Sequence, residues 1–337
     1  MKKDKTIETL RGGAILLVVV GHVIGSTAEG GMKVSDDSFY RYLYDSIIDP
    51  IQLPLFTILA GWVYSLKPIT YEHVSSFIVK KVFRLIVPML VVGMCYFFVQ
   101  NIIPGTNYHG ELTNVWKLLF FPYTMFWFLY SLFFIFIIVA LLDVNKKMNT
   151  ILSWSIVFCF SIIVLLIRDV FIPIESPNYF SYKGTLYLLP SFILGVGLNR
   201  FKTLFQSKMV VNVSIVLLIV CVLIQQLSWF NLIDFAVQKD DVVGLLIGFT
   251  SGIVLLKTRI EINWLVWVGS FAYTIYLFHG FGTAGGRILP KMLYLNTSMI
   301  IFFTSLTAGL LFPMLVDKYF NKNKLTRILF LGKNNLR

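Results

Sequence analysis

Charged residues are scarce in this sequence, and their scarcity decides the class of protein. Asp, Glu, Lys and Arg make up 14% of the 337 residues, whereas a soluble domain carries roughly 25%. Hydrophobic residues reach 57%, and the mean hydropathy is +0.78. A water-soluble chain of this length could not bury so much apolar surface in its core. The composition therefore excludes a soluble enzyme and a disordered chain, and it predicts an all-α, polytopic transmembrane helical bundle.

Cysteine is scarce as well. Cys95, Cys159 and Cys221 lie far apart, each inside an apolar run. An odd number of separated, buried cysteines excludes a disulfide-stapled secreted module and favours small core residues over metal ligands, so we expect no metal. There are 17 acidic and 29 basic residues, a net charge of +12. Because the basic residues gather at the ends of apolar runs, they indicate membrane topology rather than a nucleic-acid partner.

Long apolar runs, by contrast, recur along the whole chain, with lengths suited to a bilayer of about 30 Å of hydrocarbon. With the N-terminus in the cytoplasm, most Lys and Arg residues fall in cytoplasmic loops and ends, while the acidic residues lean to the outside, as the positive-inside rule requires. We expect about ten spans and both termini in the cytoplasm. The expected spans are residues 10–27, 47–66, 85–103, 123–142, 150–167, 185–198, 209–226, 242–256, 264–280 and 295–316.

The runs indicate one membrane-embedded domain, residues 1–337, without a soluble extracytoplasmic domain. One outer loop is long, residues 28–46, and it carries Glu29, Asp36, Asp37 and Asp45. This loop is polar enough to meet water or a hydroxyl-rich substrate.

Ionisable groups inside a span are costly, so each one is informative. His22 lies deep in the first expected span, which enters the membrane from the cytoplasm near Arg11. The two residues are eleven apart, which places them on one helix face, about 20° apart around the axis and roughly 16 Å apart along it. Ala14 and Val18 share that face and leave an apolar groove between the two polar groups. The pattern suits a long, thin ligand with an anionic head and a reactive tip. The structural alternative is that Arg11 reaches lipid phosphates while His22 bonds to a neighbouring helix.

A second basic cluster precedes Pro88 at the start of the third span. Lys80, Lys81 and Arg84 are spaced i, i+1 and i+4, so one helix face could present them to phosphate groups. Basic residues at an inner boundary are also what topology alone demands.

Aromatic and imidazole side chains mark two later spans. In the ninth, Tyr273 and Tyr276 precede His279, which this topology places near the outer face. Trp127 begins the segment Trp-Phe-Leu-Tyr in the fourth span. Taken alone, all four residues are typical of helix contacts or of an interfacial aromatic belt.

Together these motifs resemble the acyltransferase-3 family of integral membrane acyltransferases. The family's first span reads Arg-x-x-Ala-x-x-x-Val-x-x-x-His, and Arg11-Gly-Gly-Ala14-Ile-Leu-Leu-Val18-Val-Val-Gly-His22 matches every stated position. The end of the second span, Phe56-Thr-Ile-Leu59-Ala-Gly61-Trp62, is similar to the family's Phe-x-x-Leu-Ser-Gly-Phe, with Ala60 and Trp62 as departures.

Three further motifs follow in the family's order, so the resemblance covers nearly the whole chain. Lys81-Val-Phe-Arg84 is similar to an Arg-x-x-Arg pattern before a proline, with a lysine point charge in place of the first guanidinium fork. Trp127-Phe-Leu is similar to the Trp-Phe-Leu of the fourth span. Ser270-x-x-Tyr273-x-x-Tyr276-Leu-x-His279 is similar to a late Ser-Tyr-x-x-Tyr-Leu-x-His signature.

The resemblance implies a membrane O-acyltransferase of the bacterial plasma membrane and a role in the cell envelope. Such proteins move an acyl group, usually acetyl, from cytoplasmic acyl-CoA to a hydroxyl of an extracytoplasmic or lipid-linked saccharide. On this basis His22 and Arg11 are the candidate catalytic residues, and acetyl-CoA is the expected donor. Arg11, Lys80, Lys81 and Arg84 would hold the donor. The candidate acceptor-binding residues are Trp127, Tyr273, Tyr276 and His279.

Two other classes compete with this interpretation. A transporter or flippase of a lipid-linked saccharide would suit ten spans and a polar outer loop. However, ion-coupled carriers usually bury carboxylates, and the acidic residues here fall in expected loops or at span ends. A non-catalytic scaffold would leave Arg11 and His22 unexplained. The oligomeric state stays open.

Overall fold

The structure, a computed structural model, describes residues 4–108, 110–173 and 175–333. Within these ranges every regular element is helical, as the composition predicts. The α-helices are α1 Lys5–Ile24, α2 Phe39–Leu43, α3 Asp49–Ser65, α4 Val74–Lys81, α5 Val87–Ile102, α6 Trp127–Val144, α7 Ile151–Leu166, α8 Arg168–Phe171, α9 Tyr182–Arg200, α10 Lys202–Phe205, α11 Lys208–Trp229, α12 Val242–Thr258, α13 Asn263–Ser270, α14 Ala272–Met292, α15 Ser298–Phe320 and α16 Lys324–Leu331. Short π or 3-10 turns join several of them: η1 Tyr44–Ile48, η2 Tyr71–His73, η3 Val82–Ile86, η4 Leu112–Leu119, η5 Thr124–Phe126 and η6 Tyr179–Ser181.

Among the described residues, six segments are long and apolar enough to cross a bilayer, which identifies a multi-pass membrane protein. A seventh is added if α12 and α13, bent by 119° at their junction, form one broken span. Each of the ten expected ranges contains a helix, although α7, α9 and α14 do not pass the same test of length and apolarity. The six segments are Lys5–Ile24, Phe39–Ser65, Tyr71–Ile102, Leu112–Val144, Lys208–Trp229 and Ser298–Phe320.

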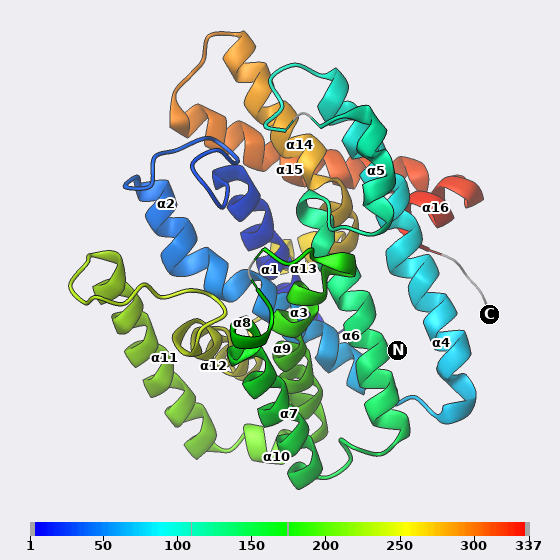
Figure 1. Cartoon of the computed structure of the whole chain (residues 1–337), viewed down its shortest axis with the longest axis vertical. Coiled ribbons are helices and arrows are strands. Elements are labelled where there is room, and N and C mark those ends of the chain that lie inside the picture. Colours follow the sequence, from blue (N-terminus) through cyan, green and yellow to red (C-terminus); the bar gives the residue numbers. More distant parts are fainter. Residues whose placement is uncertain (1–3, 109, 174, 334–337) are drawn as a thin grey trace.

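The central helix of the bundle is α1 (Figure 1), which contacts α3, α12, α13, α14 and α15. Its start is set by Asp4, whose carboxylate accepts hydrogen bonds from the backbone N–H groups of Thr6 and Ile7. Its end is set by Gly25, which adopts a φ of 93° that favours glycine. Helices α4 and α11 lie at opposite edges (Figure 1), and α11 exposes a series of aliphatic side chains suited to contact with lipid.

The ninth expected span, residues 264–280, is wrong in its boundaries. The chain breaks at Phe271 between the short helix α13 and the long helix α14, which continues to Met292. At the break Phe271 has a φ of −102° and a ψ of 0°, outside the α-helical range. The short helix α13 packs closely against α1: a Cβ on Gly12 would lie 2.1 Å from the carbonyl oxygen of Leu265, and one on Gly269 would lie 2.1 Å from that of Glu8. His279 is therefore the eighth residue of a 21-residue helix rather than the end of a span.

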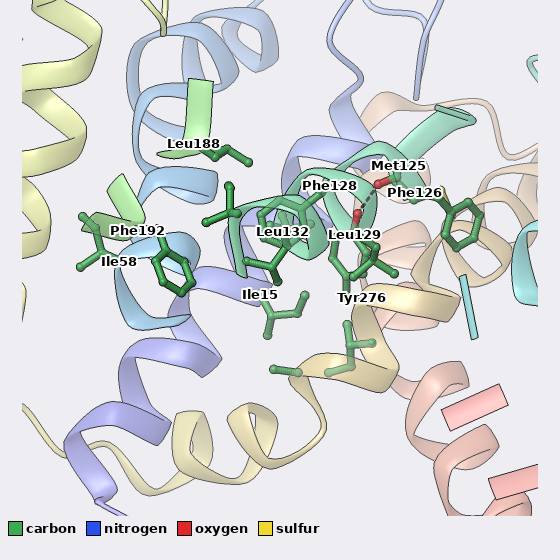
Figure 2. Close-up of a cluster of buried hydrophobic side chains, with 14 of the residues drawn as sticks. Ile15, Ile58, Met125, Phe126, Phe128, Leu129, Leu132, Leu188, Phe192 and Tyr276 are labelled. Carbon is green, nitrogen blue, oxygen red and sulfur yellow. Dashed lines mark hydrogen bonds between the residues drawn. The ribbon is translucent and has the colours of Figure 1, made fainter. Parts of the chain in front are cut away.

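The apolar core gathers around α6 (Figure 2). Phe128, Leu129 and Leu132 project from this helix toward Ile15 of α1 and Leu188 of α9. These side chains are at most 6% exposed, and they lock α1, α6 and α9 into one unit. The core therefore fixes α1, the helix that carries both Arg11 and His22.

A buried ion pair closes the bundle where α6 ends. Two nitrogens of Arg200 donate to the two carboxylate oxygens of Asp143, both at 2.6 Å. The hydroxyl of Tyr64 donates to the same carboxylate at 2.9 Å. The pair joins α3, α6 and α9 through charge-assisted hydrogen bonds.

Candidate active site

Two histidines from distant parts of the sequence meet inside the bundle. His22 belongs to the last turn of α1 and His279 to α14, and their ring centroids are 4.7 Å apart with planes tilted by 51°. His279 is 0% exposed, whereas the side chain of His22 is exposed even though α1 is the central helix. The imidazole of His22 therefore borders space that no side chain fills, although it lies deep inside the bundle, and the ring of His279 packs against it.

The hydrogen bonds of His279 fix its tautomer. Its Nδ1 lies 2.8 Å from the carbonyl oxygen of Tyr276 and 3.0 Å from that of Ile275. Carbonyl oxygens only accept, so Nδ1 carries the proton and Nε2 carries a free lone pair. That Nε2 is buried and has no hydrogen-bond partner among the described residues. A buried imidazole nitrogen without a partner is an unusual feature and marks a site for a proton donor.

Tyr276 packs against the ring of His279. Its ring lies 5.9 Å from that of His279 and 5.3 Å from that of Phe128. Its hydroxyl donates to the carbonyl oxygen of Met125, the bond drawn as a dashed line in Figure 2. The ring of Trp127 packs instead against α9, at the position that a Cβ on Gly184 would occupy.

The basic residues gather near the first half of α1. Nη1 of Arg11 donates to Oε1 of Glu8 at 2.8 Å, and the arginine side chain is 30% exposed. The charges of Arg11 and Arg84 are close enough to repel each other, and so are those of Arg84 and Lys81. The structure thus brings these three cations together, while Lys80 is exposed on the neighbouring turn.

Arg84 is held by aromatic and backbone contacts. Its guanidinium lies 4.0 Å from the ring centroid of Tyr273, and its Nη1 donates to the carbonyl oxygen of Leu331 at 3.0 Å. The Tyr273 hydroxyl donates to the carbonyl oxygen of Arg84. The Nζ of Lys81 lies 3.3 Å from the ring centroid of Phe136. Tyr273 therefore belongs with the basic residues, whereas Tyr276 belongs with the histidines.

The apolar groove expected between Arg11 and His22 is closed in this structure. Ala14 is 0% and Val18 is 2% exposed. The physical reason is that small side chains on a membrane helix let a neighbouring helix approach closely, and Ala14 packs against Leu55 and Leu59 of α3.

Two features of the site escaped the sequence analysis. Glu8 of α1 is 6% exposed and partly neutralises Arg11. Its i, i+3 spacing from Arg11 is the signal that could have shown this pairing. The contact between His22 and His279 joins residues 257 positions apart, so the sequence offers no local signal for it.

Comparison with known proteins agrees with the motifs. The family model Acyl_transf_3, described as an acyltransferase domain, matches residues 4–318 of this chain and so confirms the resemblance. No curated protein and no solved structure matches the chain.

Proposed function

We propose a specific reaction for this chain, which belongs to the Acyl_transf_3 family and is therefore a membrane acyltransferase. The proposed reaction transfers an acyl group, acetyl in the first instance, from acyl-CoA to a hydroxyl of an extracytoplasmic or lipid-linked saccharide. The observation that carries the proposal is the accessible imidazole of His22 against His279, whose Nε2 has no partner among the described residues.

The chemistry assigned to the two histidines is general base catalysis. In the proposed step, a neutral imidazole at His22 takes the proton of the acceptor hydroxyl while the hydroxyl oxygen attacks the thioester carbonyl. The C–S bond breaks, the imidazolium returns its proton to the departing thiolate, and the products are the acyl ester and CoA-SH. Because two adjacent imidazolium ions would repel each other, the two rings do not both carry a charge during the step. The free Nε2 of His279 offers a second acceptor for the same proton.

Arg11, Lys81 and Arg84 are the proposed site for the phosphates of the donor, with Lys80 at its exposed side. Three mutually repelling cations gain stability when an anion binds between them. Because the face of α1 between Arg11 and His22 is packed, the thioester reaches His22 only when α1 and α3 part along Ala14 and Val18. The proposal therefore includes an opening movement between these helices.

The proposed topology has about ten crossings of the bacterial plasma membrane, with both termini in the cytoplasm. Positive residues concentrated on one side support this orientation. Single cysteines at positions 36 and 146, in a chain whose own cysteines are replaced, test it with a membrane-impermeant maleimide. We expect Asp36→Cys to react from outside in intact cells and Lys146→Cys only after permeabilisation. The reverse pattern would overturn the orientation.

The acyltransferase proposal is tested without knowing the acceptor. Surface glycans are compared by mass spectrometry from cells that lack the gene and from cells complemented with wild type, His22→Ala or His73→Ala. We expect glycans from cells with wild type or His73→Ala to carry the acyl mass increment, since His73 lies in an exposed turn. Glycans from cells with His22→Ala should lack it. A flippase would instead change the amount of glycan, and an unchanged acyl content in His22→Ala would contradict the assigned role.

A further inference from the structure

A cavity of about 760 Å³ lies between the start of α3, the end of α11 and the loop that precedes α12. Two of its walls come from segments about 180 residues apart, and Gln225 of α11 ties them together by donating to the carbonyl oxygen of Asp45. Neither histidine belongs to its lining. The lining residues that carry the argument are Asp37, Asp45, Asp49, Gln225, Trp229 and Lys239.

The charge of this cavity is negative and only partly compensated. Asp49 pairs with Lys239 at 3.3 Å, and Asp240 pairs with Arg168 at 2.9 Å. Asp36, also in the lining, pairs with Arg41 at 3.5 Å. The carboxylates of Asp37 and Asp45 form no ion pair or side-chain hydrogen bond among the described residues, although the charges of Arg41 and Lys239 attract that of Asp45. Two unpaired carboxylates attract hydrogen-bond donors and positive charge, and they repel anions.

An unsatisfied acceptor lies beneath the same wall. Gln225 is 5% exposed, and its Oε1 is buried below the cavity surface without a hydrogen-bond partner among the described residues. Trp229 adds a flat aromatic ring to the lining. Carboxylates and an indole together suit a ligand that combines many hydroxyl or amine donors with apolar ring faces.

The carboxylates do not converge as metal ligands do. In the described part of the chain, no group of three His, Cys, Asp or Glu side chains could hold a metal ion. The cavity therefore fits an organic ligand rather than a bound cation.

Side chains at the base of the cavity contact the helix turn that carries His22. Oδ1 of Asp49 accepts hydrogen bonds from the hydroxyl of Tyr44 at 3.1 Å and from Nε2 of Gln52 at 3.4 Å. A Cβ on Gly21 would lie 2.8 Å from Oε1 of Gln52 and 3.2 Å from the ring of Tyr44, so both side chains rest on the residue next to His22. One layer of side chains thus joins the cavity to the helix turn that carries the proposed base.

We infer that this cavity binds the acceptor as a saccharide without acidic groups, rich in hydroxyl or amine donors. The inference rests on the proposed acyl transfer and narrows its acceptor class: neutral and amino sugars bind in the cavity, whereas sugar units that themselves carry uronate or phosphate groups do not. The free carboxylates of Asp37 and Asp45 take the donors, and Trp229 covers a sugar face.

Three tetrasaccharides of different charge test this inference. The probes are a glucosamine tetramer, which is cationic, its N-acetylated counterpart, which is neutral, and a galacturonate tetramer, which is anionic. Binding to the full chain in detergent is measured by calorimetry. The variants are Asp45→Asn, Asp37→Asn and Trp229→Ala, and the matched control is Asp234→Asn, an exposed aspartate of the same loop outside the cavity.

We expect the cationic tetramer to bind most tightly, the neutral one next and the anionic one least. Asp45→Asn and Asp37→Asn should each weaken the cationic tetramer about tenfold, because a charge-assisted hydrogen bond is lost, and Trp229→Ala should weaken both binding tetramers. Asp234→Asn should bind like wild type. Preferred binding of galacturonate, no binding of any probe, or equal affinities in Asp45→Asn and wild type would each overturn the inference. None of these outcomes would contradict acyl transfer, which fails if glycans from cells complemented with wild type show no acyl mass increment over glycans from cells that lack the gene.

Discussion

The two histidines allow a sharp test, because the structure places them in one unit. The variants are His22→Gln, His279→Gln and the double variant, with glutamine chosen to keep much of the side-chain volume of the buried His279. A positioned general base typically contributes about 10²–10⁴ in rate. This range equals about 3–5.5 kcal/mol of transition-state stabilisation at 1.36 kcal/mol per factor of ten. We expect each single variant to lose activity within this range.

The ring separation of 4.7 Å sets the expected result for the double variant. Residues that act as a unit are strongly non-additive, so the double variant should be no slower than the slower single variant. The assay is the initial rate of thiol release from acetyl-CoA in the presence of acceptor, with kcat and KM determined separately. The loss should appear in kcat.

Two controls separate chemistry from folding. His73→Gln introduces the same substitution in an exposed turn and should keep wild-type rates. Tyr276→Phe removes only the hydroxyl that donates to Met125, so it reports on positioning. A rate for His279→Gln equal to wild type, or a double variant whose loss is the product of the two single losses, would refute the paired role.

Three further outcomes follow from other contacts. Gly12→Ala should lower the free energy of unfolding by about 1–3 kcal/mol, because its Cβ would lie 2.1 Å from a carbonyl oxygen of α13. The control Gly13→Ala should leave the stability unchanged, because nothing lies within 4 Å of its Cβ. Equal midpoints of the two variants in thermal unfolding would contradict this packing. Arg84→Gln should weaken acyl-CoA binding about 10- to 100-fold by calorimetry through loss of a charge-assisted phosphate contact, and an unchanged Kd would remove Arg84 from the donor site. Asp143→Asn should destabilise the protein by about 3–5 kcal/mol, because Arg200 is left buried without its counter-charge; denaturation in detergent measures this loss, and a wild-type stability would show that the pair contributes nothing.

The sequence predicts the helical class and the approximate position of most helices, because apolar runs of suitable length must become helices in a bilayer. It predicts the boundaries near residue 271 wrongly, since the apolar run there continues through the break. The close approach of α13 to α1 at Gly12 and Gly269 is a tertiary contact with no local signature either.

The candidate site, too, can be predicted from the sequence only in part. The spacing of Arg11 and His22 predicts one helix that carries both, and α1 contains both. The spacing cannot show that Ala14 and Val18 admit α3 instead of a ligand, since small residues permit either. Nor can it show that Tyr273 and Tyr276, three residues apart, serve two different clusters, because that depends on contacts with Arg84 and Met125 from other parts of the chain.

The bond between Arg84 and the carbonyl of Leu331 has a practical consequence for handling the protein. Gly332 follows in a left-handed conformation and rests on the backbone of Arg84, so the tail is seated on this arginine from two sides. An affinity tag or a fluorescent protein fused to the C-terminus would disturb the contacts of the Arg84 guanidinium. Kinetic constants measured with such a fusion would therefore include the effect of the tag, and the tag should be cleaved off before CoA titrations are compared.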